Sequence, residues 1–153
     1  MKYKFISKIL TKEDIKEIEN KIAEVEKNTS GEIRLCIKKK KNYGQRNLSS
    51  RAIALEEFHK LKMNDTKEGT GVLIFILLKE RLFEIVADYG INSKVNQIFW
   101  DSIVQRMAIE FRNNNFKNGI IHCIEAIGDK LKKEFPRKLD DINELPDTVS
   151  IEN

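Results

Sequence analysis

Two short apolar runs, joined by three polar residues, constrain the fold of this chain more than any other feature. The first run begins at Gly71 and is apolar from residue 72 to residue 78. The second run, residues 82–88, follows the tripeptide Lys79-Glu80-Arg81. Each run is too short for an amphipathic helix and lacks strict alternation, which is typical of strands covered on both faces. The polar tripeptide predicts a tight hairpin. We therefore expect a buried sheet in which these two strands are antiparallel.

The segment before this hairpin predicts a helix, a strand and a second helix. Thr11, followed by Lys12 and the acidic residues Glu13 and Asp14, can cap a helix whose apolar positions repeat at helical spacing until the turn at 28–31. Residues 32–37 alternate between polar and apolar side chains, as a strand does. After a loop at 38–46, a second helix is expected, capped by Asn47, Ser49 or Ser50. Its predicted apolar stripe consists of Leu48, Ala52, Leu55, Phe58 and Leu61.

The order strand, helix, strand predicts a parallel pair with a right-handed crossover. After the hairpin, a loop at 91–94 precedes a helix over about 96–112, and a last helix runs from 116 to the residue before Pro136. These elements predict a three-layer α/β/α sandwich: a small mixed sheet, made of the βαβ unit and the antiparallel hairpin strand, flanked by about four helices. Residues 1–136 would form this domain, and residues 137–153 an acidic, non-periodic tail that is mobile or loosely packed.

Length and composition limit the class of protein. A chain of 153 residues with 41% apolar side chains fits one globular domain. No apolar run approaches the roughly 20 residues that a membrane-spanning helix needs, and the first ten residues do not resemble a secretory signal. Cys36 and Cys123 lie far apart in apolar surroundings, which indicates two buried thiols in a reducing compartment. We therefore expect a cytoplasmic protein.

The formal net charge is +4, and part of the excess comes from the lysine run 38–41. Such a run can be a solvated loop, or a patch for an acidic partner such as nucleic acid, anionic lipid or a phosphorylated ligand. Tyr43 is the one aromatic residue interleaved nearby, so the stacking platform of a single-strand binder is missing. This pattern argues against nucleic acid as a partner.

Strand direction predicts that polar residues gather at one edge of the sheet. The strands at 32–37 and 71–78 would begin there, and the strand at 82–88 would end there. Carboxylate, amide and main-chain oxygens of this kind suit calcium or magnesium, although carboxylates at a sheet edge also commonly cap helices or pair with lysine. Asp88 is the strongest candidate, because it ends an apolar strand where an unpaired carboxylate is costly. The candidate metal ligands are Glu32, Glu68, Asp88, Asn92 and Asp101.

Well-known catalytic motifs are missing from the sequence. Gly69-Thr70-Gly71 precedes a strand and does not open a helix, so it is neither a dinucleotide-binding fingerprint nor a P-loop. No GxSxG or HExxH pattern occurs. His59 and His122 both fall on predicted helices without an obvious nucleophile beside them. The sequence thus offers no convincing nucleophile or general acid.

Several of these segments resemble the TPM domain family, named for a thylakoid lumen protein, a photosystem II repair protein and a modulator of acetylcholine receptors. The resemblance covers roughly residues 10–135. The occurrence of Asp88 and Asn92 together with Trp100-Asp101 in one sequence resembles a stand-alone bacterial branch of the family. The matching segments are Glu68-Gly69-Thr70-Gly71-Val72-Leu73-Ile74, Arg81 with residues 83–91, Trp100-Asp101, Phe111-Arg112 and residues 116–120. Asn92 stands where the family pattern has a glutamate, Asp88 where it has a glycine, and the acidic residue usual after Arg112 is missing.

The resemblance implies an α/β/α sandwich, binding of divalent cations, calcium in particular, in a cleft at one sheet edge, and acid phosphatase activity for some members. We therefore expect a calcium-binding protein, with magnesium as the alternative ion and with weak metal-dependent phosphatase activity to be tested. The alternative is a non-catalytic interaction module. In that case the cation would stabilise a cleft for a protein partner, in the assembly or maintenance of a membrane-associated complex.

Overall fold

A four-stranded mixed sheet forms the centre of the molecule. The computed structural model describes residues 4–139 and 143–152, and within them the strand order is β3-β2-β1-β4. The strand β1 is parallel to β2 and β4, whereas β2 and β3 form the predicted antiparallel hairpin. The predicted βαβ unit is thereby confirmed. The strands are β1 (Glu32–Lys38), β2 (Gly71–Leu77), β3 (Leu82–Ala87) and β4 (Ser150–Glu152).

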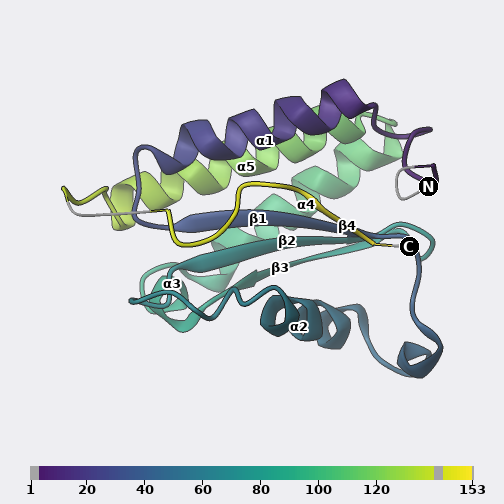
Figure 1. The fold of residues 1–153 in the computed structure, drawn as a ribbon, viewed down its shortest axis with the longest axis horizontal. Helices are drawn as coiled ribbons and strands as arrows, with labels where there is room; N and C mark the ends of the chain where they lie inside the picture. The colour runs from purple at the N-terminus through teal and green to yellow at the C-terminus, as the bar shows by residue number, and fades with distance from the viewer. Residues whose placement is uncertain (1–3, 140–142, 153) are drawn as a thin grey trace.

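Helices cover both faces of this sheet and give the predicted three-layer α/β/α sandwich (Figure 1). The helices α1, α4 and α5 lie on one face, and α2 lies on the other. None of the helices that the described residues form is long and apolar enough to cross a bilayer. The helices are α1 (Lys12–Glu26), α2 (Ser50–Lys60), α3 (Tyr89–Asn92), α4 (Gln97–Arg112) and α5 (Phe116–Glu134), with a short 3-10 helix η1 (Tyr43–Gln45).

The unbroken apolar run of β2 follows from its central position in the sheet. Val72, Ile74 and Ile76 pack on the side of α1 and α5. The alternate residues Leu73, Phe75 and Leu77 pack on the side of α2. Because both faces are buried, a polar residue on either one would need a partner inside the protein.

Local capping fixes the starts of the long helices. Thr11 and Asp14 form a reciprocal capping box at α1, in which each side chain accepts from the other residue's N–H. Ser49, one of three candidates from the sequence, caps α2 by accepting from the N–H of Ala52. Asn96 caps α4 in the same way. The predicted helix starts are therefore confirmed.

The predicted apolar stripe of α2 is correct for Leu48, Phe58 and Leu61, which pack on the sheet side, and wrong for Leu55. Leu55 is 40% exposed, and the residues of α2 that face the sheet are Ile53, Ala54, Glu57 and Phe58. The predicted stripe did not include Glu57, which is buried beside Lys38 of β1.

Two further segments differ from the sequence expectation. The expected loop at 91–94 overlaps a short helix, α3, which Asp88 caps. Residues 143–152, expected to belong to a loosely packed tail, follow the β1 edge, bury Leu145 and end in β4. Main-chain pairing with β1 needs no apolar periodicity, so the pattern could not reveal this strand. Residues 1–3 of the predicted domain, and residues 140–142 and 153 of the predicted tail, lie outside the described residues.

Candidate functional site

The starts of β1 and β2 and the end of β3 lie side by side at one edge of the sheet, called the rim below. Glu32 pairs with Gly71 in the register of β1 and β2. The N–H of Asp88 donates to the carbonyl oxygen of Gly71 at 2.9 Å, and the N–H of Glu32 donates to that of Thr70 at 2.9 Å. Glu32, Gly71 and Asp88 thus form a row across three adjacent strands, as the predicted strand directions require.

Glycines bring the main chain of two rim turns close together. Gly69 has φ 67°, and a side chain there would overlap the ring of Tyr89. A side chain at Gly90 would overlap the carbonyl oxygens of Glu68 and Gly69. The first turn of α3 therefore packs directly on the main chain of residues 68–69, beside Asp88.

Asp88 holds the N-terminus of α3. Its Oδ1 accepts from the N–H of Tyr89 at 2.8 Å. Its Oδ2 is buried and has no hydrogen-bond partner in the part of the chain that the structure describes. A buried carboxylate oxygen without a donor is unusual, because desolvation is costly when no hydrogen bond replaces water. Asp88 thus has one oxygen engaged and one oxygen without a protein donor.

Glu32 is buried, with 4% of its surface exposed, and its carboxylate turns toward residues 144–145. Its Oε1 accepts from the N–H groups of Glu144 and of Leu145, the latter at 3.1 Å. Its Oε2 is buried and has no hydrogen-bond partner among residues 4–139 and 143–152. Burial raises the pKa of Glu32 to about 7, although the two amide donors oppose the rise.

The remaining predicted ligands have partners of their own. The exposed side chain of Glu68 pairs with Lys138 at 2.7 Å. The amide nitrogen of Asn92 donates to the carbonyl oxygen of Ala87 at 2.8 Å, which keeps it at the rim. Asp101 lies on the exposed side of α4, where its Oδ1 accepts from Gln97 at 3.0 Å. The fold thus places Glu32, Glu68, Asp88 and Asn92 at the rim, and Asp101 bonds within its own helix.

A further acidic pair, Glu26 and Asp147, lies next to the start of β1 and was not expected from the sequence. Glu26, the last residue of α1, is 6% exposed, and its Oε2 accepts from the N–H of Ile33 at 2.8 Å. Burial, followed by a hydrogen bond with Asp147, raises the pKa of Glu26 to about 9. The helical pattern assigned Glu26 to the polar face, and no local signal indicated that residues 143–149 would cover it.

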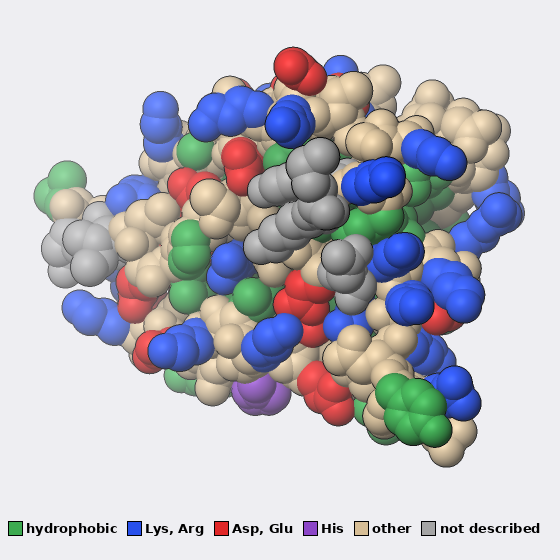
Figure 2. All heavy atoms as spheres, turned by 45° about the vertical axis from the view of Figure 1, so that its right-hand side comes forward, with side chains coloured by type: hydrophobic (Ala, Val, Ile, Leu, Met, Phe, Trp, Pro, Cys, Tyr) green, Lys and Arg blue, Asp and Glu red, His purple; other side chains and the backbone are tan. Residues whose placement is uncertain are grey.

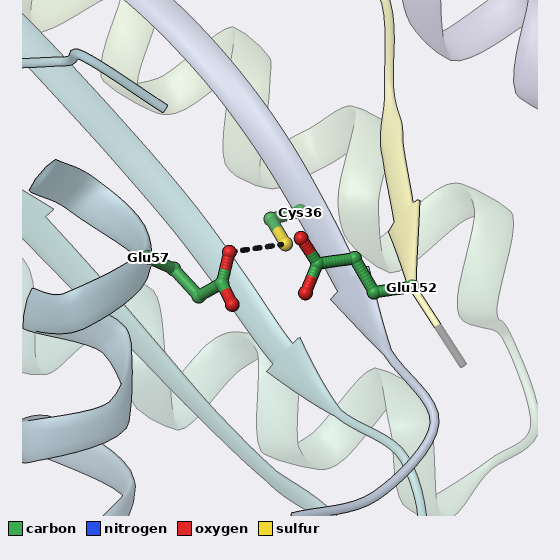
Figure 3. Close-up of side chains that lie close together, drawn as sticks. All are labelled: Cys36, Glu57 and Glu152. Carbon is green, nitrogen blue, oxygen red and sulfur yellow. Dashed lines mark hydrogen bonds between the residues drawn. The ribbon is translucent and has the colours of Figure 1, made fainter. Parts of the chain in front are cut away.

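A second polar cluster lies under α2, toward the other end of β1 (Figure 3). Cys36, Glu57 and Glu152 bring their ligand-type atoms within 4.8 Å of one another. The thiol of Cys36 donates to Glu57 at 3.9 Å. The ammonium of Lys38 lies 3.3 Å from Glu152 and 3.9 Å from Glu57, and that of Lys60 lies 2.8 Å from Glu152. The cluster joins β1, α2 and β4.

The electrostatics of this cluster indicate an internal ion pair and not a metal centre. Burial, and then the hydrogen bond with Glu152, raises the pKa of Glu57. Burial opposes ionisation of Glu152 too, but hydrogen bonds from Lys60 and Glu57 outweigh it and lower the pKa. Lys38, only 2% exposed, already supplies a buried cation. Burial also raises the pKa of Cys36 to about 12, so this thiol is neutral and unreactive.

Two features of the sequence place members of this cluster on buried faces, although neither one predicts that charged residues pair there. Glu57 lies four residues after Ile53, on the same face of the helix. Cys36 and Lys38 occupy alternate positions of β1, on the face opposite Ile33, Leu35 and Ile37.

The fold and the rim define a class of protein: a small α/β/α domain whose mixed sheet carries a carboxylate- and carbonyl-rich edge where its parallel strands begin. The chain belongs to the TPM domain family, whose model matches residues 6–130. It is similar to the BA42 protein from the psychrophilic bacterium Bizionia argentinensis, known from an NMR structure. The two are 41% identical, with a TM-score of 0.84, over 94% of this chain and 95% of that one. Among curated proteins, none matches the chain.

Two more distant solved structures share the fold. The N-terminal domain of a protein from P. gingivalis is 15% identical, with a TM-score of 0.68, over 83% of this chain and 79% of that one. The N-terminal domain of the cg2496 protein from Corynebacterium glutamicum is 10% identical, with a TM-score of 0.62, over 88% and 81%. At such identities the likeness concerns the fold alone.

Proposed function

We propose that this TPM domain protein binds a divalent cation, calcium before magnesium, at the rim. The observation that carries the proposal is the Oδ2 atom of Asp88, which is buried without a hydrogen-bond donor among the described residues. A cation beside this oxygen would replace the lost hydration. Carboxylate oxygens are the ligands that calcium and magnesium prefer in proteins.

Asp88 is the principal ligand in this proposal, and the other rim groups add ligand oxygens where their side chains can extend to the ion. Neighbouring strands lie about 4.8 Å apart, so the Cα atoms of Glu32 and Asp88 are about 10 Å apart across β2. Glu32 would join the same ion by turning its free Oε2 toward β2. The remaining proposed ligands are Glu68, Asn92 and Asp101, with main-chain carbonyl oxygens of residues 68–70 beside them.

The cation would serve one of two functions. When bound, a divalent cation can polarise a phosphoryl oxygen, which is the chemistry that weak acid phosphatase activity requires. His59 lies on α2 and His122 on α5. Cys36 belongs to the cluster under α2, and the proposal therefore assigns the reaction to the carboxylates of the rim. The alternative is a module in which the cation stiffens the rim for a protein partner, in the assembly or maintenance of a membrane-associated complex. Free, buried cysteines support a cytoplasmic setting for either function.

A calorimetric titration tests the cation site. We expect saturable binding of calcium, with magnesium binding more weakly. Asp88→Asn should weaken calcium binding at least about tenfold, because ligand charge sets calcium affinity, while asparagine still caps α3. Glu32→Gln keeps an acceptor for the amides of 144–145 and reports on the second carboxylate. Asp129→Asn, on the exposed side of α5, is the matched control. No heat with either ion, together with a melting temperature unchanged by EDTA, would refute the site.

A phosphate-ester assay separates the enzyme from the module. With calcium or magnesium bound, wild-type protein and Asp88→Asn are compared on p-nitrophenyl phosphate. Turnover that Asp88→Asn abolishes, while its circular dichroism is unchanged, identifies an enzyme. Calcium binding without turnover, combined with calcium-dependent retention of a protein partner, identifies the module.

A further inference from the structure

A cavity opens at the opposite end of the sheet from the rim, with a volume of about 620 Å³. Its wall combines the end of β2, the turn at 79–81, the end of α4 and the start of α5. The volume falls within the range of about 300–1,000 Å³ that is usual for small-molecule sites. The cavity is therefore large enough for a ligand and is independent of the proposed cation site.

The inner wall of the cavity is apolar and largely aromatic. Phe83, Phe111 and Phe116 line it together with Ile9 and Leu78, and all five side chains are half-buried. The rings of Phe83 and Phe111 meet edge to face at 5.4 Å between centroids, and those of Phe111 and Phe116 lie 5.2 Å apart. These contacts fix the aromatic wall, so an apolar guest would bury more surface without first reordering it.

Two arginines from separate elements lie at the mouth of the cavity. Arg81 belongs to the hairpin turn, and Arg112 is the last residue of α4. Within residues 4–139 and 143–152, neither guanidinium forms an ion pair or a hydrogen bond. Each one therefore has its full set of donors available for an anion, and guanidinium groups bind carboxylates and phosphates through paired hydrogen bonds.

The surroundings of the mouth add positive charge. The N–H of Lys79 donates to the carbonyl oxygen of Lys39 at 2.9 Å, which places the exposed Lys39 beside the hairpin turn, whereas Lys38 is buried in its ion pair with Glu57 and Glu152. Figure 2 shows Lys and Arg side chains gathered among apolar ones on this end of the molecule. Glu80, in the same turn, is the opposing charge. Basic residues outnumber it, so the local potential favours anions.

We propose that this cavity binds a small anionic amphiphile, an aliphatic chain with one carboxylate or phosphate head. The chain lies against the aromatic wall, and the head is held at the mouth by Arg81 and Arg112. Charge complementarity selects the head, and the apolar lining selects the tail. This assignment also gives a role to Lys39 and Lys40, the exposed lysines of the run, which attract the anion without contacting its tail.

Calorimetry or NMR titration with defined probes tests the proposal. Decanoate and decyl phosphate carry the two candidate heads, decanol carries no charge, and hexanoate has a shorter tail. We expect saturable binding of at least one anion, tightened about fourfold by each added methylene group. Decanol should bind at least about tenfold more weakly than the anion of the same chain, because it lacks charge-assisted hydrogen bonds. The stronger of decanoate and decyl phosphate identifies the head.

Matched variants locate the site. Arg112→Gln and Arg81→Gln should each weaken decanoate binding about tenfold, whereas Arg106→Gln, an exposed arginine of α4 outside the cavity lining, should leave it unchanged. Ala108→Phe, which fills the cavity, should abolish binding of every probe, with the fold checked by circular dichroism. The proposal is overturned by any of three results: no saturation, equal affinity for decanol, or affinity unaffected by both arginine substitutions. Binding to anionic vesicles without binding of the monomeric probes would likewise replace it with membrane docking.

Discussion

Replacing Glu26 by glutamine should stabilise the protein above neutral pH. Glu26 lies at the end of α1, is 6% exposed and accepts from the N–H of Ile33. Burial, and then the hydrogen bond with Asp147, raises its pKa from 4.5 to about 9. The folded protein therefore keeps the proton of Glu26 at pH values where the unfolded chain has released it. Glutamine preserves the acceptor for Ile33 and cannot ionise.

The size of the effect follows from proton linkage. A group whose pKa is raised on folding contributes stability that is present below the unfolded pKa and is lost as the pH rises toward the folded pKa. One pKa unit corresponds to about 1.36 kcal/mol, so the free energy of unfolding should fall by about 4 kcal/mol between about pH 5 and pH 8 through Glu26 alone. This loss is a large fraction of the roughly 5–15 kcal/mol that stabilises a typical domain. In Glu26→Gln that part of the pH dependence should vanish.

Urea denaturation at about pH 5, 6.5 and 8, with EDTA present throughout, measures this difference. We expect the two proteins to be similarly stable at pH 5 and Glu26→Gln to be clearly more stable at pH 8. Glu24→Gln is the control, because Glu24 is two-thirds exposed and forms a surface ion pair with Lys21 at 3.0 Å. Parallel pH curves for wild type and Glu26→Gln would refute the argument that Glu26 is neutral in the folded protein.

Three further substitutions or reactions test the packing. Lys38→Met removes the buried cation between Glu57 and Glu152 and should lower the free energy of unfolding by about 3 kcal/mol. Adding Glu57→Gln in a double variant should restore part of this free energy, and additive losses in denaturation would contradict the ion pair. Gly90→Ala should lower the free energy of unfolding by about 2 kcal/mol, because the new side chain overlaps the main chain of residues 68–69. Gly44 has open space around it, so Gly44→Ala should change the free energy of unfolding by less than about 0.5 kcal/mol. Equal melting temperatures for the two variants would show that the main chain at the rim can move to accommodate the side chain. The thiols of Cys36 and Cys123 should react with a thiol reagent only after unfolding, since both are buried; fast native labelling would contradict this.

The sheet and most helices could be predicted because their patterns are local. The apolar run of β2 and the alternation of β1 reflect which faces are buried, and Thr11 and Asn96 cap their helices through contacts three residues away. Strand directions then placed Glu32 and Asp88 at one rim without any coordinates. Local periodicity, capping and chain direction were sufficient for these features.

Features that depend on contacts between distant segments could not be predicted. The strand β4 forms by pairing of Ile151 with Ile37, and its apolar content is too small to give a pattern. Glu57 and Lys38 are buried because each neutralises the other beside Glu152, whereas a helical pattern assigns charged residues to solvent. Residues 144–145, which precede β4, bind the carboxylate of Glu32 through their N–H groups, and no local pattern indicates this contact.

The modest net charge conceals a separation of charge along the strands. Glu32 and Asp88 lie near the rim, while Lys39, Arg81 and Arg112 lie at the other end of β1 and β2. The seven residues of β1 separate the two ends by about 20 Å, which is roughly two Debye lengths at 0.1 M salt. Each end carries groups that a bound ion of opposite charge would stabilise.

Cation binding at the rim and anion binding at the cavity should therefore stabilise the fold independently. A ligand that binds only the folded state adds RT ln(1 + [L]/Kd) to the free energy of unfolding. With calcium and decanoate each at about 100 times its Kd, each should add about 2.7 kcal/mol, and both together about twice that. Denaturation with each ligand alone and with both measures the coupling, using concentrations of calcium and decanoate low enough to avoid precipitation. A combined effect well below the sum would show that the two ends share one site or one conformational change, contrary to the separation that the strands impose.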